Sequence, residues 1–352
     1  LPFGRAVLEG RGGHEGTPVT RMGLIHLDEE DVGLDLVDWR RKDATELLKL
    51  RRDIAGVVHL DAKQICDDRL RAAIREASPD VLSLSFAPGP RIPHKSPACL
   101  ADLGGMPLHL MVPAADGELV AALAGIEGLE TLILRSPELD GEALTAIGRS
   151  PSLRTLDLGA AQVGADALVH LEGLPSLESL SLFGTLADDT SMAHLPNPRG
   201  LRSLDLGFTA VGDAGLAKIA EITALRVLGL WHTGVTDAGL QLLGALENLT
   251  ALDLAGTRVG DPGVAHLTAL EGLRRLDLTG TTVTDAGLAV LTSLPELEVL
   301  RLGGTGITDG GLLALAAFPR LRLLDLRSAA VSRGGVEALR RVRPEMDIRF
   351  GR

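Results

Sequence analysis

The residues of this chain whose types and spacing could do chemistry are two His-Leu-Asp triplets, at 26–28 and 59–61. A histidine beside a carboxylate can act as a general acid–base pair. In a strand, however, the histidine and the aspartate of a triplet point to the same face simply because side chains alternate. We therefore expect His26, Asp28, His59 and Asp61 to have structural roles at the edge of the fold rather than catalytic ones.

No other pattern in the sequence indicates catalysis or metal binding. The chain contains no G-x-S-x-G, H-E-x-x-H, P-loop or CxxC motif. Cys66 and Cys99 lie outside any Cys/His cluster with metal-ligand spacing. We expect both to be small buried hydrophobic residues rather than a disulfide. We accordingly expect a protein that is not an enzyme, with no catalytic residues, no metal site and no cofactor.

Charge and apolar content restrict the class of partner. The formal net charge is −12, which repels phosphate backbones and anionic membrane surfaces. No apolar run approaches the ~18 residues of a membrane span. We expect neither nucleic acid nor a membrane as partner, and a cytoplasmic monomer. Because the chain opens at Leu1 rather than Met, secretion after removal of an upstream segment stays open. Only five of the 35 basic residues are lysine, a bias typical of GC-rich bacterial genomes.

The elements that must position any site follow a 24-residue repeat. Each L-x-L pair predicts a short strand with one buried face. The phrase G-V-T-D-A-G-L at 234–240 recurs, slightly varied, at 282–288 and 306–312, and apolar residues at helical spacing follow it. Each repeat is therefore predicted to be a strand, a turn, a helix of two to three turns and a return loop. The first leucines of eight uninterrupted repeats are Leu153, Leu177, Leu201, Leu225, Leu249, Leu273, Leu297 and Leu321.

The repeated Thr-Asp pair marks the expected start of each helix. Asp237, Asp285 and Asp309 are placed to be N-cap residues that accept hydrogen bonds from free helical amides. Pro262 follows Asp261 directly, and the first helical position is the one that proline prefers. The aspartates are thus predicted to be architectural rather than calcium ligands.

Residues 225–240, LRVLGLWHTGVTDAGL, resemble the leucine-rich-repeat superfamily over about residues 57–352. The match is to the cysteine-containing, ribonuclease-inhibitor-like subclass, with the pattern L-x-x-L-x-L-x-x-(C/N/T)-x-x-(I/V)-T-D-x-G-L. Where the family usually has Cys or Asn, this chain has threonine. The resemblance implies that these threonines hydrogen-bond the buried loop backbone of neighbouring repeats: Thr185, Thr209, Thr233, Thr257, Thr281 and Thr305.

The expected fold is α/β, a right-handed leucine-rich-repeat solenoid. Paired strands lie ~4.8 Å apart whereas packed helices need ~8–10 Å, so the array must curve into a horseshoe with a parallel sheet on its concave face and helices on its convex face. Residues 1–56 are predicted to be an irregular N-terminal segment and cap, with a strand at 24–27 and a helix at 44–50. Residues 57–352 hold about twelve repeats and a C-terminal closing strand around Ile348 and Phe350. Because prolines cluster in 87–104, we expect a loop there.

The concave face holds the candidate partner-binding residues. Phe183, Phe208, Trp231 and His232 come from three successive repeats, and large side chains exposed on a sheet commonly anchor interfaces. The structural alternative is that these rings pack on one another or under the ascending loops.

A central column of the same face is rich in aspartate and includes Asp205, Asp253 and Asp277. This column is either a solvated face with cross-strand ion pairs, such as Arg301 between Asp277 and Asp325, or an acidic surface for a partner with a basic surface.

The favoured function is a protein–protein interaction scaffold that binds a macromolecular partner on its concave face. Fold alone does not determine function, so two alternatives stay open. One is a substrate-recognition subunit or effector of the F-box, ubiquitin-ligase-like type, although residues 1–56 contain no convincing F-box pattern. The other is the regulatory arm of a longer enzyme.

Overall fold

The computed structural model describes most of the repeat array and a few residues that precede it. The described residues are 34–35, 57–61, 66, 68, 71–72, 74, 81–85, 96–103, 105, 107–112, 116–134, 139–196 and 199–351. The strand expected at 24–27 and the helix expected at 44–50 lie outside them.

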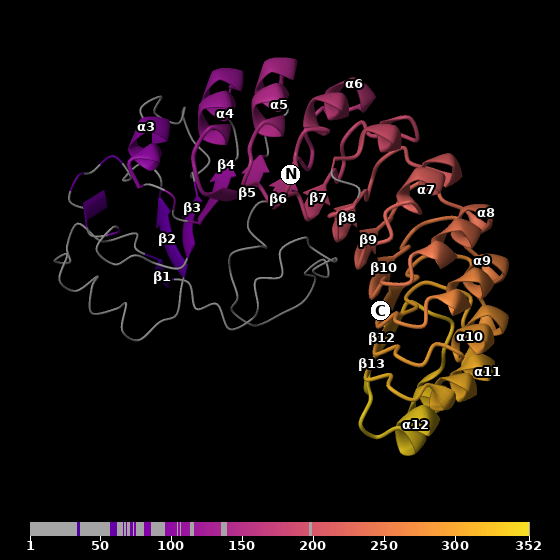
Figure 1. Ribbon diagram of the computed structural model, residues 1–352. Helices are drawn as coiled ribbons and strands as arrows, with labels where there is room; N and C mark the ends of the chain where they lie inside the picture. Colours follow the sequence, from indigo (N-terminus) through magenta and orange to yellow (C-terminus); the bar gives the residue numbers. More distant parts are fainter. Residues whose placement is uncertain are drawn as a thin grey trace.

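A single parallel sheet runs through the described residues, with its strands in chain order. Each strand pairs with the next in a register of 24 residues over most of the array, for example Leu204 with Leu228. The sheet follows the concave side of the arc in Figure 1, and the space-filling view shows one continuous curved body. The strands are β1 (Leu34–Asp35), β2 (Val57–Asp61), β3 (Val81–Ser85), β4 (Leu108–Val112), β5 (Leu129–Leu134), β6 (Thr155–Asp157), β7 (Ser179–Ser181), β8 (Ser203–Asp205), β9 (Val227–Gly229), β10 (Ala251–Asp253), β11 (Arg275–Asp277), β12 (Val299–Arg301), β13 (Leu323–Arg327) and β14 (Asp347–Gly351).

Short helices cover the convex side, as the mismatch between strand and helix spacing predicts (Figure 1). Several of them are a single α-turn continued by a 3₁₀ turn, which keeps each repeat narrow. They are α3 (Ser96–Ala101), α4 (Gly117–Ala124), α5 (Gly141–Gly148), α6 (Ala165–Leu168), η3 (Val169–Leu171), η4 (Ser191–His194), α7 (Asp213–Ile219), α8 (Asp237–Leu240), η5 (Gln241–Ala245), α9 (Asp261–His266), η6 (Leu267–Ala269), α10 (Asp285–Leu291), α11 (Asp309–Leu312), η7 (Leu313–Ala317) and α12 (Arg333–Val342).

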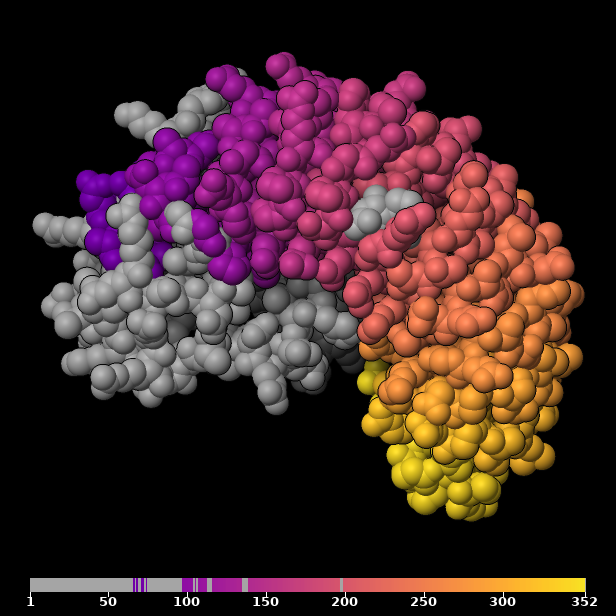
Figure 2. Space-filling view, in the orientation of Figure 1, coloured from indigo at the N-terminus to yellow at the C-terminus, as the bar shows by residue number. Residues whose placement is uncertain are grey.

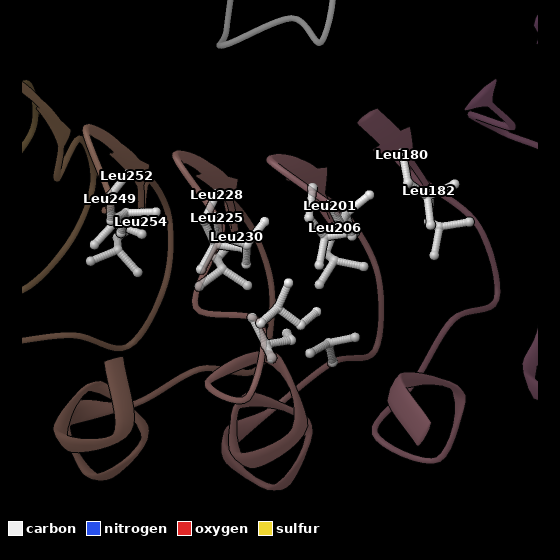
Figure 3. Packing of buried hydrophobic residues seen from close by; sticks show 14 of the residues in the cluster. Leu180, Leu182, Leu201, Leu206, Leu225, Leu228, Leu230, Leu249, Leu252 and Leu254 are labelled. Atoms are coloured by element: carbon white, nitrogen blue, oxygen red, sulfur yellow. The ribbon is translucent and has the colours of Figure 1, made fainter. Parts of the chain in front are cut away.

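The repeating leucines form the core between the two layers. Leu201, Leu204 and Leu206 are fully buried, and so are their equivalents in the neighbouring repeats. Figure 3 shows these side chains pointing from the strands toward the helices. The alternation of the L-x-L motif therefore places every second strand residue in the core and leaves the others on the concave face.

The expected loop at 87–104 is wrong in part, because α3 occupies Ser96–Ala101. Pro97 lies in the first turn of this helix, where the amide that proline lacks has no intrahelical partner in any case. The cluster of prolines therefore does not exclude a helix that starts at Ser96.

The assignment of the repeated aspartates as N-caps is also wrong, by one residue. The N-cap of α10 is Thr284, whose hydroxyl accepts the N–H of Ala286 at 3.3 Å. Asp285 is the first residue inside the helix. Likewise, Gly260 is the N-cap of α9, and Pro262 follows one position later than predicted.

The displaced aspartates join each repeat to the next. Asp261 accepts the N–H of Thr284 at 2.8 Å and its hydroxyl at 2.5 Å. Asp285 accepts the same two groups of Thr308, at 2.9 and 2.6 Å. Each of these aspartates thus holds the start of the following helix through two charge-assisted bonds. Bonds to the following repeat are also made by Asp189, Asp213, Asp237 and Asp309.

Glycine is required two positions after the aspartate of each pair. A Cβ at Gly287 would lie closer than 3.0 Å to the carboxylate of Asp261, and the same holds at Gly263 for Asp237. The T-D-x-G motif is therefore explained by contact between repeats. The aspartate reaches across to the next helix, and the glycine makes room for it.

The buried threonine that recurs in each of these repeats has a different role from the one that the resemblance implies. Thr209 donates its hydroxyl hydrogen to the carbonyl of Leu206 at 2.6 Å, and Thr233 donates to Leu230 at 2.5 Å. The acceptor is three residues earlier in the same repeat rather than in a neighbour. The threonine closes its own turn, for which one hydroxyl is enough.

The prediction that the two cysteines are unpaired is wrong. Cys66 and Cys99 form a disulfide with a Cα–Cα distance of 5.2 Å. Because 32 residues separate them and they belong to different repeats, the sequence alone offers no spacing from which to infer the pairing. The bond links the segment after β2 to α3, near the N-terminal end of the described array.

The C-terminal repeat is closed by β14 and by one arginine. β14 pairs with β13 over five residues. The guanidinium of Arg343 donates to the carbonyls of Phe318 and Leu321 at 2.7 and 2.9 Å. These bonds satisfy main-chain acceptors that a further repeat would otherwise cover.

The packing between repeats predicts an inverted outcome for a substitution that usually stabilises helices. A Gly-to-Ala substitution in a helix commonly raises the free energy of unfolding by about 1 kcal/mol. Gly287→Ala should instead lower it by about 1–3 kcal/mol, because the new Cβ would clash with the carboxylate of Asp261. Gly244→Ala is the matched control, since the nearest atom there is 3.5 Å away. Chemical denaturation measures both. Equal effects of the two substitutions would contradict the packing described.

The disulfide predicts that the oxidised chain contains no free thiol and that non-reducing digestion yields a peptide joining Cys66 to Cys99. Reduction removes a cross-link between residues 33 apart, and the free energy of unfolding should fall by about 3–4 kcal/mol. The double variant Cys66→Ser/Cys99→Ser should show the same loss and no further response to reductant. Two titratable thiols in protein from its native compartment would contradict this prediction.

Candidate functional site

The turn that follows each of the strands β6 to β13 contains one residue in the left-handed backbone region. At this position φ is +61° in Gly184, +66° in Gly256, +69° in Gly280 and +65° in Gly304. Glycine adopts this conformation without steric cost. The turn lies where each strand ends, at the carboxyl edge of the concave sheet.

Two aromatic side chains occupy the same turn position in successive repeats. Phe208 has a φ of 57° and His232 a φ of 52°. A non-glycine residue in this region costs on the order of 1 kcal/mol, and such strain tends to be kept at functional sites. The fold accepts glycine here, as Gly184 and Gly256 on either side demonstrate. Ala160 and Ser328 hold the same conformation, so the position tolerates a side chain, but in the turns after β6 to β13 only Phe208 and His232 place a ring there.

A third ring enters the group because one glycine leaves space for it. Phe183 and Trp231 are two repeats apart, with Gly207 at the equivalent position between them. A Cβ at Gly207 would lie closer than 3.0 Å to the indole of Trp231. The indole therefore lies across Gly207 and stacks on Phe183, with 5.0 Å between ring centroids and 18° between planes.

The four rings form one surface, which we call the aromatic platform: Phe183, Phe208, Trp231 and His232. Phe208 stands edge-to-face against Trp231, with centroids 4.2 Å apart, and lies 4.6 Å from the ring of His232. These are favourable aromatic geometries. Gly256 makes room for His232, since a Cβ there would be 2.6 Å from its Cε1.

The rings pack on one another, as the structural alternative anticipates, yet they are not withdrawn from solvent. Phe208 is 49% exposed. His232 is exposed, and Phe183 and Trp231 are half-buried. The mutual packing fixes the orientation of the platform and leaves part of it accessible.

The aspartates of the central column have a structural role. Each aspartate accepts the main-chain N–H of the residue two positions later, at 2.9 Å in each case. The donor is Gly207 for Asp205, Ala255 for Asp253 and Thr279 for Asp277. Asp253 is 1% exposed and Asp277 is 4% exposed. These two carboxylates close the ends of their strands and offer little direct contact surface. Asp205 is half-buried.

Further along the column, the predicted ion pair of Arg301 with Asp277 is present, but Asp325 pairs with Arg327 instead of Arg301. Arg301 lies 3.4 Å from Asp277, whereas Asp325 is bound by Arg327 at 2.5 Å. Burial raises the pKa of the Asp325 carboxyl, but the hydrogen bonds and charge of Arg327 outweigh burial and hold that pKa below its usual value.

Sequence reasoning missed the glycines that shape the site. Gly207 and Gly256 carry no chemistry of their own, but they determine where Trp231 and His232 lie. A signal was available, because aligning the repeats places Phe208 and His232 in a column otherwise filled mainly by glycine.

The remaining candidates do not form a second site. The triplet at 26–28 lies outside the described residues, and His59 and Asp61 are described only as residues of β2. Among the described residues, no group of three or more His, Cys, Asp or Glu is placed to hold a metal ion. None of the described helices has the length and apolarity that crossing a membrane requires.

Comparison with known proteins agrees with the repeat geometry. A family model for the leucine-rich repeat matches residues 199–220, 245–268, 273–291 and 294–316. No curated protein matches the chain significantly. Among solved structures, the internalin inlF of Listeria monocytogenes is 18% identical with a TM-score of 0.52, and the match covers 76% of this chain and 77% of that chain.

Two further bacterial structures show weaker likeness. Internalin C2 of Listeria monocytogenes is 22% identical, with a TM-score of 0.42 and coverage of 61% of this chain and 84% of that chain. A leucine-rich-repeat protein of Leptospira interrogans is 15% identical, with a TM-score of 0.45 and coverage of 88% and 99%. The 24-residue strand–turn–helix unit and the likeness to the internalin show a leucine-rich-repeat solenoid fold, and the family model matches four segments within its repeats.

Proposed function

We propose that this protein is an interaction module without catalytic activity of its own and that it binds a protein partner through the aromatic platform. Leucine-rich-repeat proteins generally act in protein–protein interaction. The observation that carries the proposal is that Phe208 and His232, in adjacent repeats, present large rings from a turn position with a left-handed backbone, where the other turns after β6 to β13 have glycine, alanine or serine. The ring contacts only offset the backbone strain, so stability gains little from aromatic side chains at this position, whereas binding would gain from them.

The platform has the composition and rigidity of an interface anchor. Tryptophan is among the residues most enriched in binding hot spots. Because the rings of Phe183, Phe208 and Trp231 already pack on one another, a partner would have to immobilise few side chains, and the entropy cost of binding would be low. The platform lies at the carboxyl edge of β7, β8 and β9.

We also propose that the chain belongs to the cysteine-containing, ribonuclease-inhibitor-like subclass. The recurring T-D-x-G motif, whose aspartate binds the start of the next helix, supports this assignment.

The disulfide bears on the compartment. Disulfides persist in oxidising environments and are rare in the cytosol. We therefore propose an oxidising compartment in place of the cytoplasmic one expected from the sequence.

Phe208→Gly separates binding from folding. It removes the ring and relieves backbone strain of about 1 kcal/mol, which offsets aromatic contacts worth about 0.5–1.5 kcal/mol. The free energy of unfolding should change by less than about 1 kcal/mol. Partner capture should fall by at least about tenfold, the size expected when a hot-spot residue is lost.

Capture from a lysate of the source organism, quantified by mass spectrometry, measures the effect. Ser328→Gly is the matched control, because Ser328 has a φ of 61° at the same turn position but lies far along the sheet. Proteins captured by the parent chain should be retained by Ser328→Gly and lost by both Phe208→Gly and Trp231→Ala. If both platform variants captured the same proteins as the parent chain, the platform would not be the binding surface.

A further inference from the structure

A row of mostly charged side chains runs along the edge of the sheet where the strands begin. Each repeat contributes the residue directly after its first leucine, and main-chain hydrogen bonds join the row. Arg226, for example, donates its N–H to the carbonyl of Arg202 at 2.7 Å, and Thr250 donates to Arg226 at 2.8 Å. Neighbouring members are therefore one strand apart, about 4.8 Å. The row consists of Glu130, Arg154, Glu178, Arg202, Arg226, Thr250, Arg274, Glu298 and Arg322.

Positive and negative charges alternate along most of this row. Glu178 lies 2.7 Å from Arg154 and 3.8 Å from Arg202. Glu298 likewise pairs with the arginines of the repeats before and after it. Opposite charges on adjacent strands stabilise a sheet, so each of these glutamates supports the two repeats that flank it.

The alternation breaks at Arg226. Its neighbours in the row are Arg202 and Thr250, so the row contains no carboxylate between Arg202 and Arg274. The hydroxyl of Thr250 donates to the carbonyl of Arg226 at 3.0 Å and adds no charge. Arg226 is exposed, and in the part of the chain that the structure describes no ion pair includes its guanidinium.

The fold does not require arginine at this place in the row. Glu178 and Glu298 occupy the equivalent place in their own repeats. A glutamate at 226 would lie one strand from Arg202, as Glu178 lies one strand from Arg154. Arg226 instead places two like charges opposite each other, which costs stability. The guanidinium of Arg226 is thus an exposed positive charge that folding does not need.

We propose that the part of the row from Arg202 to Arg274, which we call the arginine stretch, binds an acidic segment of the protein partner, with one carboxylate held by Arg226. A guanidinium binds a carboxylate through planar, paired hydrogen bonds, and a carboxylate from the partner would restore the alternation of charge. Nucleic acid also offers anions to arginine, but the net charge of −12 repels a polyanion more strongly than a segment with a few carboxylates.

This inference rests on the proposed function and adds a second contact for the same partner. The arginine stretch and the aromatic platform lie at opposite ends of the same strands. Arg226 precedes β9, and Trp231 of the platform follows it five residues later. At about 3.3 Å per residue, five residues correspond to about 16 Å along the strand. A partner segment that crosses the sheet can therefore reach both.

The test uses the full chain and two synthetic peptides as probes. The first is a Gly/Ser peptide with glutamate at three alternate positions, and the second has glutamine at the same positions. Fluorescence anisotropy at low salt should show the glutamate peptide binding at least about threefold more tightly, as expected for exposed ion pairs. Arg226→Glu should remove this difference.

Arg226→Gln removes the charge without reversing it, and it should weaken binding of the glutamate peptide by about two- to threefold. Arg154→Gln is the matched control. Arg154 belongs to the same row and its side chain is 54% exposed, but it already lies between two carboxylates. Its loss should leave the affinity unchanged. The thermal midpoint of Arg226→Glu should not fall below that of the parent chain, because the new glutamate can pair with Arg202.

The outcomes separate this inference from the proposed function. Equal affinity for the glutamate and glutamine peptides, or no effect of Arg226→Gln and Arg226→Glu, would overturn the acidic-segment inference. So would a single-stranded oligonucleotide of the same charge that binds as tightly and depends equally on Arg226. Protein capture that still depended on Phe208 and Trp231 would leave the proposed function in place. If capture depended on neither ring, the proposed function itself would fail.

Discussion

The closeness of successive repeats is the constraint on which the rest of the structure depends. One carboxylate oxygen of Asp261 occupies the space that a side chain at Gly287 would need, and the same carboxylate binds the first residues of the next helix. Such contacts hold the helix starts of successive repeats close together. The unbroken 24-residue period from Leu153 to Leu321, the buried leucines and the constant strand register of these repeats are all compatible with this close packing.

Features that repeat within one unit could be predicted from the sequence. The L-x-L strands, the leucine core and the parallel sheet follow from local periodicity. Two of the errors concern partners in another repeat. The aspartates bind the following repeat rather than capping their own helix, and Cys66 pairs with Cys99 across a repeat boundary. A periodic pattern predicts the position of a residue within its own repeat, but it does not predict which atoms of the adjacent repeat that residue contacts.

The candidate site illustrates the same division. The four aromatic residues stand out in the sequence because the chain has so few large rings. Their arrangement depends on Gly207, across which Trp231 reaches Phe183, and on the positive φ of Phe208 and His232. The acidic column was open to two interpretations, and burial of Asp253 and Asp277 favours the structural one.

The turn column also affects how such a protein can change over time. Its side chains stand outside the leucine core, and whichever residue occupies a turn, the main chain keeps the same path, as Gly184, Phe208 and Ser328 show. The surface at these turns can therefore change one position at a time without a change of the interior. Each substitution of glycine by another residue there costs a similar, local backbone strain of about 1 kcal/mol. Each turn after β6 to β13 thus offers one exposed position that can vary independently, and two adjacent turns have a ring there, Phe208 and His232.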